Sequence, residues 1–119
     1  PNIRTYISVD GGMADSPRYI LYKSEYEAIV ANKANEERTE KVTIAGKCCE
    51  SGDLIGENMS LQHAESGDII AVCATGAYNY SMSSNYNRLQ KPAVVFVNKG
   101  TSRIAVKRET LDDIIRNDV

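Results

Sequence analysis

The chain has 119 residues, 42% of them hydrophobic, and a formal net charge of −2 at pH 7, which is the composition of one soluble domain. A chain of this length buries roughly two-thirds of its unfolded surface on folding. Lysine and arginine are spread along the sequence, which excludes the basic surface that nucleic-acid binding requires. The longest apolar runs, 69–74 and 93–97, are too short to span a membrane.

The start of the chain indicates whether it is part of a longer polypeptide, and its cysteines indicate the cellular compartment. No Met and no signal peptide precede the strand pattern that starts near Pro1, so we expect a piece of a longer polypeptide. Cys48 and Cys49 are neighbours, and adjacent cysteines rarely form a disulfide because the peptide between them must distort. We therefore expect reduced thiols and a cytoplasmic location. A zinc site is disfavoured, since there is no Cys-x-x-Cys pair and His63 is the single imidazole.

The first half of the chain predicts several short strands. Alternating apolar residues indicate strands over 3–9 and 39–45. Residues 25–34 fit helix or strand, and their β-branched side chains favour strand. A weaker strand is predicted over 55–62, interrupted by a turn at 56–58.

The second half continues the pattern and ends in a helix. Residues 69–74 are apolar enough to form a strand buried on both faces. Strands over 93–97 and 102–106 form a predicted hairpin, and Thr110 is the expected N-cap of a terminal helix. The whole chain, 1–119, is therefore expected to be one all-β domain, a barrel or sandwich with a short C-terminal helix.

The stretch Gly46–Asp53 holds the residues best suited to chemistry. A cysteine thiol can donate or accept a proton near neutral pH, and in Cys49 it stands directly before Glu50. The alternative is a buried small cysteine beside a surface acid. Asp53 is interpreted as a turn former.

Arg18, Tyr22 and Tyr78 are candidate binding residues. Arg18 with Tyr22, four residues on, could hold a carboxylate bidentately with support from the phenol, or could be a surface arginine over an aromatic ring. Tyr78 could donate its hydroxyl to a phosphate or carboxylate, or could be a packed barrel tyrosine. The residues alone thus indicate recognition and proton transfer, without the complete machinery of an enzyme.

Five motifs, taken together and in order, resemble the C-terminal part of the diaminopimelate decarboxylase family over almost the whole chain. They are Asp10-Gly11-Gly12-Met13, Pro17–Tyr22, Cys49–Asp53, Gly76-Ala77-Tyr78 and Ser81–Asn87. The resemblance implies a pyridoxal 5′-phosphate (PLP) enzyme of the alanine-racemase-like, fold-type III class. In this class an N-terminal (β/α)8 barrel carries the Schiff-base lysine, and a C-terminal β-barrel completes a site at a homodimer interface. The implied reaction converts meso-2,6-diaminopimelate to L-lysine and carbon dioxide, in lysine biosynthesis.

The resemblance also implies roles for single residues. Cys49 is the catalytic proton donor after decarboxylation, and Glu50 binds an amino group at the distal centre of the substrate. Arg18 and Tyr22 hold a substrate carboxylate, and Tyr78 contacts both cofactor and substrate. In the family, the cysteine and glutamate reach into the site of the partner subunit. No metal is implied.

The chain departs from the family in its extent. The lysine-bearing barrel, of roughly 250 residues, is absent, as is a second substrate arginine that precedes this region, and the first strands of the C-terminal barrel are expected upstream. We therefore expect this chain alone neither to hold PLP covalently nor to decarboxylate, and we expect its open edges to promote self-association. Two rivals remain open: an ornithine or arginine decarboxylase, which typically has Cys-Asp at this motif, and a non-catalytic binding or dimerisation module of the same fold.

Overall fold

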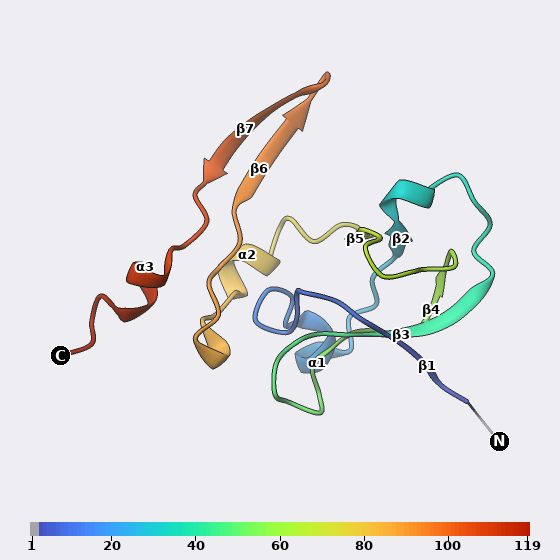
Figure 1. The fold of residues 1–119 in the computed structure, drawn as a ribbon, viewed down its shortest axis with the longest axis horizontal. Coiled ribbons are helices and arrows are strands. Elements are labelled where there is room, and N and C mark those ends of the chain that lie inside the picture. The colour runs from blue at the N-terminus through green and yellow to red at the C-terminus, as the bar shows by residue number, and fades with distance from the viewer. Residues whose placement is uncertain (1–2) are drawn as a thin grey trace.

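Three sheets organise the fold, which a computed structural model describes for residues 3–119 (Figure 1). The largest sheet has three strands in the order β1-β3-β4, with β1 parallel to β3 and β3 antiparallel to β4. Its strands are β1 (Thr5–Ser8), β3 (Glu40–Ala45) and β4 (Leu54–Leu61). Two antiparallel pairs complete the strands: β2 (Ala28–Val30) with β5 (Ile70–Val72), and β6 (Val94–Asn98) with β7 (Thr101–Val106).

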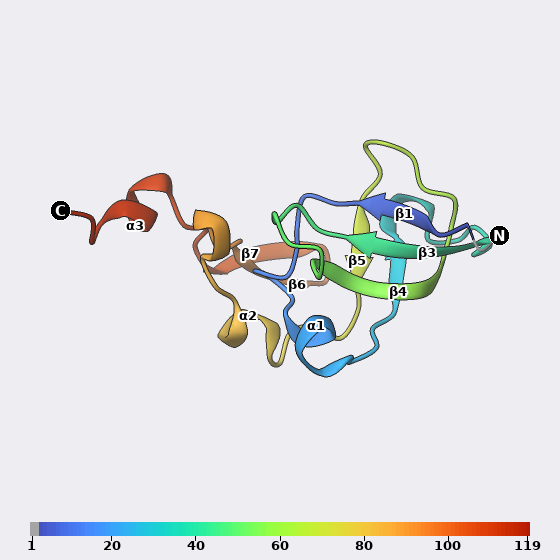
Figure 2. The ribbon, with the colours of Figure 1, turned by 90° about the horizontal axis from the view of Figure 1, so that it is seen from below.

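Five short helices lie between or after the strands in residues 3–119. They are α1 (Arg18–Tyr22), η1 (Ala31–Lys33), α2 (Asn79–Met82), η2 (Tyr86–Arg88) and α3 (Leu111–Ile115). Of these, α1 contacts β4. Figure 2 shows β1, β3 and β4 side by side, with α3 at the far end of the molecule from β1. None of the helices in residues 3–119 is both long and apolar enough to cross a membrane.

The hydrophobic core lies where β2 packs against β3 and β4. Val30, Val42, Ile44 and Leu61 are at most 1% exposed. The amide of Val30 donates to Oε1 of buried Gln62 over 3.0 Å, so a polar side chain in the core has its acceptor satisfied. This core fixes the central sheet whose strand ends lead into the loops described below.

Much of the predicted secondary structure is confirmed. Strands β1 and β3 lie within the predicted ranges 3–9 and 39–45. Strands β6 and β7 match the predicted ranges 93–97 and 102–106, and each extends one residue further toward the turn between them. The sheet-rich class with a short C-terminal helix is correct. Thr110 caps α3 as expected, and Asp113 completes a capping box with it. The strands of the described residues form three sheets and not one closed barrel.

Other expectations were wrong in detail. Only Ala28–Val30 within 25–34 is strand, because η1 follows at once. The turn expected at 56–58 is a β-bulge inside one strand: Met59 pairs with Val42 and Gly56 with Ile44, and Asn58 takes a φ of 55° to accommodate the extra residue. The strand expected within 69–74 is only half-buried, because β5 pairs with β2 alone.

Candidate functional site

Arg18 lies between two tyrosine rings. Its guanidinium carbon is 4.7 Å from the ring centre of Tyr78 and 5.5 Å from that of Tyr22, distances typical of cation–π contact. Tyr22 and Tyr78 are exposed, whereas Arg18 is half-buried. The stacking matches the aromatic contact considered from sequence, and it also holds the guanidinium where an anion could reach it.

The helix α1 sets this geometry. It begins directly after Pro17, whose restricted φ suits the start of a helix, and it ends at Lys23 in the left-handed region with φ 55°. Arg18 and Tyr22, four residues apart, therefore lie on one helix face. No helix was predicted here, because five residues are too few for a helical period to be visible in the sequence.

Tyr19 anchors α1 to the central sheet. Its hydroxyl donates to Oε2 of Glu57 on β4 over 2.6 Å, and Arg4 pairs with the other oxygen of that carboxylate over 2.8 Å. The hydrogen bond to Glu57 is the largest cause that raises the pKa of Tyr19, to about 12, and the same bond lowers the pKa of Glu57. Tyr19 is therefore a neutral donor at physiological pH and a structural member of α1.

Cys49 and Glu50 lie on the loop that joins β3 to β4. The Cys49 side chain is exposed, whereas Cys48 is buried. Oε1 of Glu50 accepts hydrogen bonds from the amide of Gly52, over 3.2 Å, and from the hydroxyl of Ser51, over 3.4 Å. The loop also meets α1, since a Cβ added at Gly52 lies 2.7 Å from the side chain of Ile20.

The two adjacent thiols have different environments. Burial raises the pKa of Cys48, and the negative charge of Asp53 adds to that rise. Cys48 is therefore held as a buried thiol, while Cys49 faces solvent. Of the two, Cys49 is the one that can reach a substrate.

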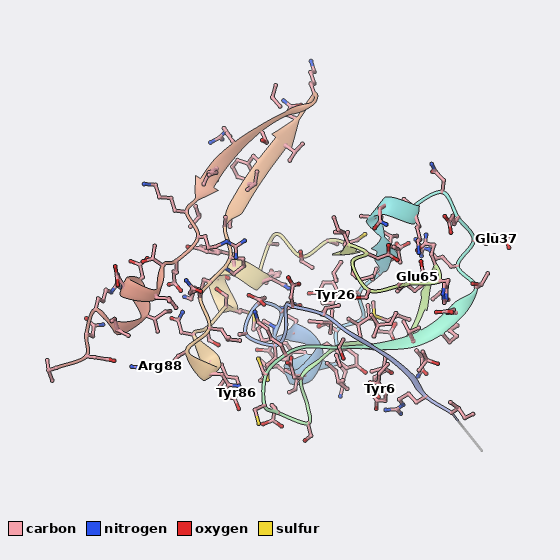
Figure 3. The ribbon with its side chains drawn as sticks, in the orientation of Figure 1. Tyr6, Tyr26, Glu37, Glu65, Tyr86 and Arg88 are labelled. Atoms are coloured by element: carbon pink, nitrogen blue, oxygen red, sulfur yellow. The ribbon has the colours of Figure 1, made fainter. Side chains whose placement is uncertain are left out.

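The segment that carries Tyr78 is tied to the loop before α1. Nδ2 of Asn79 donates to Oγ of Ser16 over 2.7 Å, and the amide of Ser84 donates to the carbonyl of Ala14 over 2.9 Å. Further along, Arg88, labelled in Figure 3, bonds the Asp118 carboxylate near the C-terminus at 2.8 and 2.7 Å. Sequence reasoning missed the Ser16–Asn79 contact, because it joins residues 63 positions apart.

The five predicted site residues thus form two groups. Arg18 contacts both Tyr22 and Tyr78. Within residues 3–119, no hydrogen bond or ion pair connects Cys49 or Glu50 to that group.

One apolar cleft within residues 3–119 contains none of the five. It has a volume of about 480 Å³ and lies between the central sheet and β6, with apolar residues such as Val9, Ile55, Val72 and Val94 in its wall.

The side chains present fit an anionic ligand and do not fit a metal. No group of three or more His, Cys, Asp or Glu side chains that could hold a metal ion occurs in the described part of the chain. Arg18 and the Tyr78 hydroxyl offer a cation and a donor, the partners that a phosphate or carboxylate requires.

Comparison with known proteins identifies the family. Residues 2–76 match the family described as "Pyridoxal-dependent decarboxylase, C-terminal sheet domain". The chain belongs to this family. The resemblance inferred from the five motifs is therefore confirmed, and the sheet-rich fold is that of the C-terminal sheet domain of the pyridoxal-dependent decarboxylases.

Similar proteins place the chain more closely within the decarboxylase family. It is 58% identical over 118 residues to a diaminopimelate decarboxylase of Synechocystis, which covers 99% of this chain and 25% of that protein. It is 50% identical over 119 residues to the Bacillus subtilis diaminopimelate decarboxylase, covering 100% of this chain and 27% of that protein. A crystal structure of the M. jannaschii diaminopimelate decarboxylase in complex with L-lysine aligns with a TM-score of 0.87 at 36% identity, covering 96% of this chain and 26% of the other. The chain therefore spans about a quarter of the length of these relatives.

Proposed function

We propose that the chain is the C-terminal domain of a PLP-dependent diaminopimelate decarboxylase, which converts meso-2,6-diaminopimelate to L-lysine and carbon dioxide. The observation that carries this proposal is the 58% identity over 99% of the chain to the Synechocystis diaminopimelate decarboxylase. The L-lysine in the M. jannaschii relative supports the same product. Lysine biosynthesis in the cytoplasm is the corresponding cellular role.

Arg18, Tyr22 and Tyr78 form the binding half of the proposed site. The half-buried guanidinium of Arg18, stacked between two rings, binds a substrate carboxylate through two parallel N–H donors. Tyr22 supports this carboxylate with its hydroxyl, and Tyr78 contacts both the substrate and the cofactor. PLP supplies the electron sink for decarboxylation, and its attachment lysine belongs to the remainder of the full-length protein.

Cys49 and Glu50 form the proton-transfer half. The exposed thiol of Cys49 gives its proton to the substrate carbon that has lost carbon dioxide. The carboxylate of Glu50 binds the ammonium group at the distal centre of the substrate. In the family that the chain resembles, the cysteine and glutamate of this motif reach into the site of the partner subunit, so we assign the two halves to different sites of a homodimer. Cys49 and Glu50 of one subunit then complete the site of its partner.

The test uses the full-length protein that contains this chain. We expect release of L-lysine and carbon dioxide from meso-diaminopimelate, with kcat/KM for ornithine or arginine lower by about 10⁴-fold or more, because these substrates lack the distal carboxylate and leave its partners in the site unpaired. Cys49→Ala should lower kcat by about 10²- to 10⁴-fold, which is the rate enhancement that a positioned proton donor usually provides. The PLP absorption band should be unchanged, because the thiol does not bind the cofactor.

Cys73→Ala is the matched control, since it removes a thiol that lies outside the proposed site. Its kcat should equal that of the wild type. Preferred turnover of ornithine or arginine would contradict the substrate assignment. Full activity of Cys49→Ala would contradict the assigned role of the thiol and favour a binding or dimerisation module.

A further inference from the structure

Asp53 joins two loops through a buried carboxylate. The residue is 3% exposed. Its Oδ1 accepts the amide of Met13 over 2.6 Å, and its Oδ2 accepts the amide of Cys48 over 2.6 Å. Hydrogen bonds to an ionised acceptor are stronger than neutral ones, so this carboxylate is a firm connection between residues 40 positions apart.

Backbone hydrogen bonds close the same loop around Asp53. The amide of Gly46 donates to the carbonyl of Asp53 over 2.9 Å, and the amide of Asp53 donates to the carbonyl of Glu50 over 3.0 Å. The amide of Lys47 reaches the carbonyl of Gly11 in the other loop over 3.1 Å. Cys49 and Glu50 therefore lie on a short closed loop whose base is Asp53.

Two glycines, Gly12 and Gly46, leave the space that the Asp53 carboxylate occupies. A Cβ added at Gly12 lies 2.8 Å from Oδ2 of Asp53, and one added at Gly46 overlaps the same carboxylate. The two loops thus approach each other at positions where only glycine fits. A larger acid at position 53 has no room, and a smaller residue leaves the amides of Met13 and Cys48 buried without acceptors.

We propose that Asp53 is a positioning residue that holds the loop of Cys49 and Glu50 in register with the loop 10–17. The second loop leads directly into Arg18, and it is tied through Ser16 to Asn79, next to Tyr78. Asp53 thereby fixes the loop of the proton donor against the rest of its own subunit, from which Cys49 reaches the site of the partner subunit. The inference rests on the proposed function for its catalytic consequence, whereas the link between the loops stands on the geometry alone.

Asp53→Asn in the full-length protein tests the proposal with little change in volume. Both carboxylate oxygens face N–H donors, so an amide must turn its own NH2 group toward one of them and lose that bond. The matched control is Asp15→Asn, because within residues 3–119 the Asp15 carboxylate accepts only the amide of Gly12 in its own loop.

The first measurement needs no catalysis. Alkylation with iodoacetamide, read by fragmentation mass spectrometry, should modify Cys49 at least about tenfold faster than Cys48 in the wild type and in Asp15→Asn. In Asp53→Asn the released loop should expose Cys48, and the ratio should fall to within about threefold. A ratio unchanged by Asp53→Asn overturns the proposal.

The second measurement is the kinetics with meso-diaminopimelate. Asp53→Asn should lower kcat by about 10- to 100-fold, the effect of displacing a reacting group by about 1 Å, with KM changed less than about threefold and the PLP band retained. A variant with wild-type kcat overturns the inference and leaves the proposed function standing. If the wild type does not decarboxylate this substrate, the proposed function and the catalytic role of Asp53 both fail, and the alkylation ratio still reports on the link between the loops.

Hydrogen exchange of the wild type covers the case in which Asp53→Asn does not fold. The amides of Met13 and Cys48 should exchange at least about tenfold more slowly than those of Cys49 and Ser51, which donate no hydrogen bond within residues 3–119. Equal exchange of the four amides overturns the proposal.

Discussion

Arg18 shows how the type of cation matters at a single position. A guanidinium is planar, so it can stack on the ring of Tyr78 at 4.7 Å and still present two parallel donors to a carboxylate. A lysine ammonium carries the same charge, but it is not planar and cannot offer two parallel N–H donors to one carboxylate. The substitution Arg18→Lys therefore separates charge from geometry.

We expect Arg18→Lys in the full-length protein to raise KM for meso-diaminopimelate by about tenfold, because one of two parallel hydrogen bonds is lost. Steady-state kinetics measures this. The matched control is Arg103→Lys, since the Arg103 guanidinium stacks on Phe96 at 4.8 Å in the hairpin β6–β7. Equal KM values for Arg18→Lys and Arg103→Lys would show that Arg18 is only a surface cation over an aromatic ring.

At the residue scale, sequence reasoning found chemical types but not their connections. It identified Asp53 as a turn former, and the carboxylate does close its own loop. Its hydrogen bond to the amide of Met13, 40 residues away, depends on how the chain folds back on itself. No periodic pattern in the sequence predicts such a contact. The difference between Cys48 and Cys49 likewise depends on which thiol the loop turns inward.

At the scale of elements, Asp68 connects η1 to the strand pair β2–β5. Its Oδ1 accepts from Asn32 over 2.7 Å, and its Oδ2 lies 2.8 Å from Nζ of Lys33 and accepts the amide of Glu65 over 2.8 Å. These bonds, with Lys33 first, lower the pKa of Asp68. The ionised carboxylate thus holds the turn before β5 against the end of β2.

We expect Asp68→Asn to speed hydrogen exchange at the amide of Ala31, which bonds the carbonyl of Ile69, by about tenfold at pH 7. Because the pKa of Asp68 is lowered on folding, its contribution is complete above the unfolded pKa near about 4 and is lost as pH falls further. The difference in exchange rate between wild type and Asp68→Asn, measured at pH 7, 5 and 3, should therefore shrink only at pH 3.

Glu65→Gln is the matched control, since the Glu65 side chain is 70% exposed and its ion pair with Lys33 is longer, at 3.3 Å. A difference that grows at low pH would contradict this role of Asp68.

The elements that the sequence predicted well are those with a repeated local pattern. Alternation revealed β1 and β3, two strand-like runs joined by a turn revealed the hairpin, and the cap Thr110 revealed α3. The sequence could not predict α1, since five residues hold little more than one turn. Nor could it predict the partial exposure of β5, because burial of an apolar strand depends on how many strands flank it.

At the scale of the whole molecule, the chain is less compact than its length alone suggests. Its radius of gyration is 15.4 Å, against about 13.5 Å for a compact domain of this size. The hairpin contributes to this, with Val97 and Ile104 74% and 65% exposed. These apolar side chains fit the expectation that the chain alone self-associates, which stays a prediction.

The separation of the five site residues into two groups leads to a prediction about the dimer. If each site takes Arg18 from one subunit and Cys49 from the other, Cys49→Ala and Arg18→Ala each damage both sites of their own homodimer. A mixed dimer, in contrast, contains one site with both changes and one intact site.

Mixing equal amounts of the two inactive full-length variants, after reversible dissociation, should therefore restore about one quarter of the wild-type kcat, since half of the dimers are mixed and each has one working site. The matched control mixes Cys49→Ala with Cys49→Ala/Arg18→Ala, in which no combination yields an intact site. Recovery in the first mixture and none in the control supports shared sites. If no activity returns although mixed dimers are detected by native mass spectrometry, Arg18 and Cys49 of the same subunit serve the same site, and the loop that Asp53 holds turns toward its own α1.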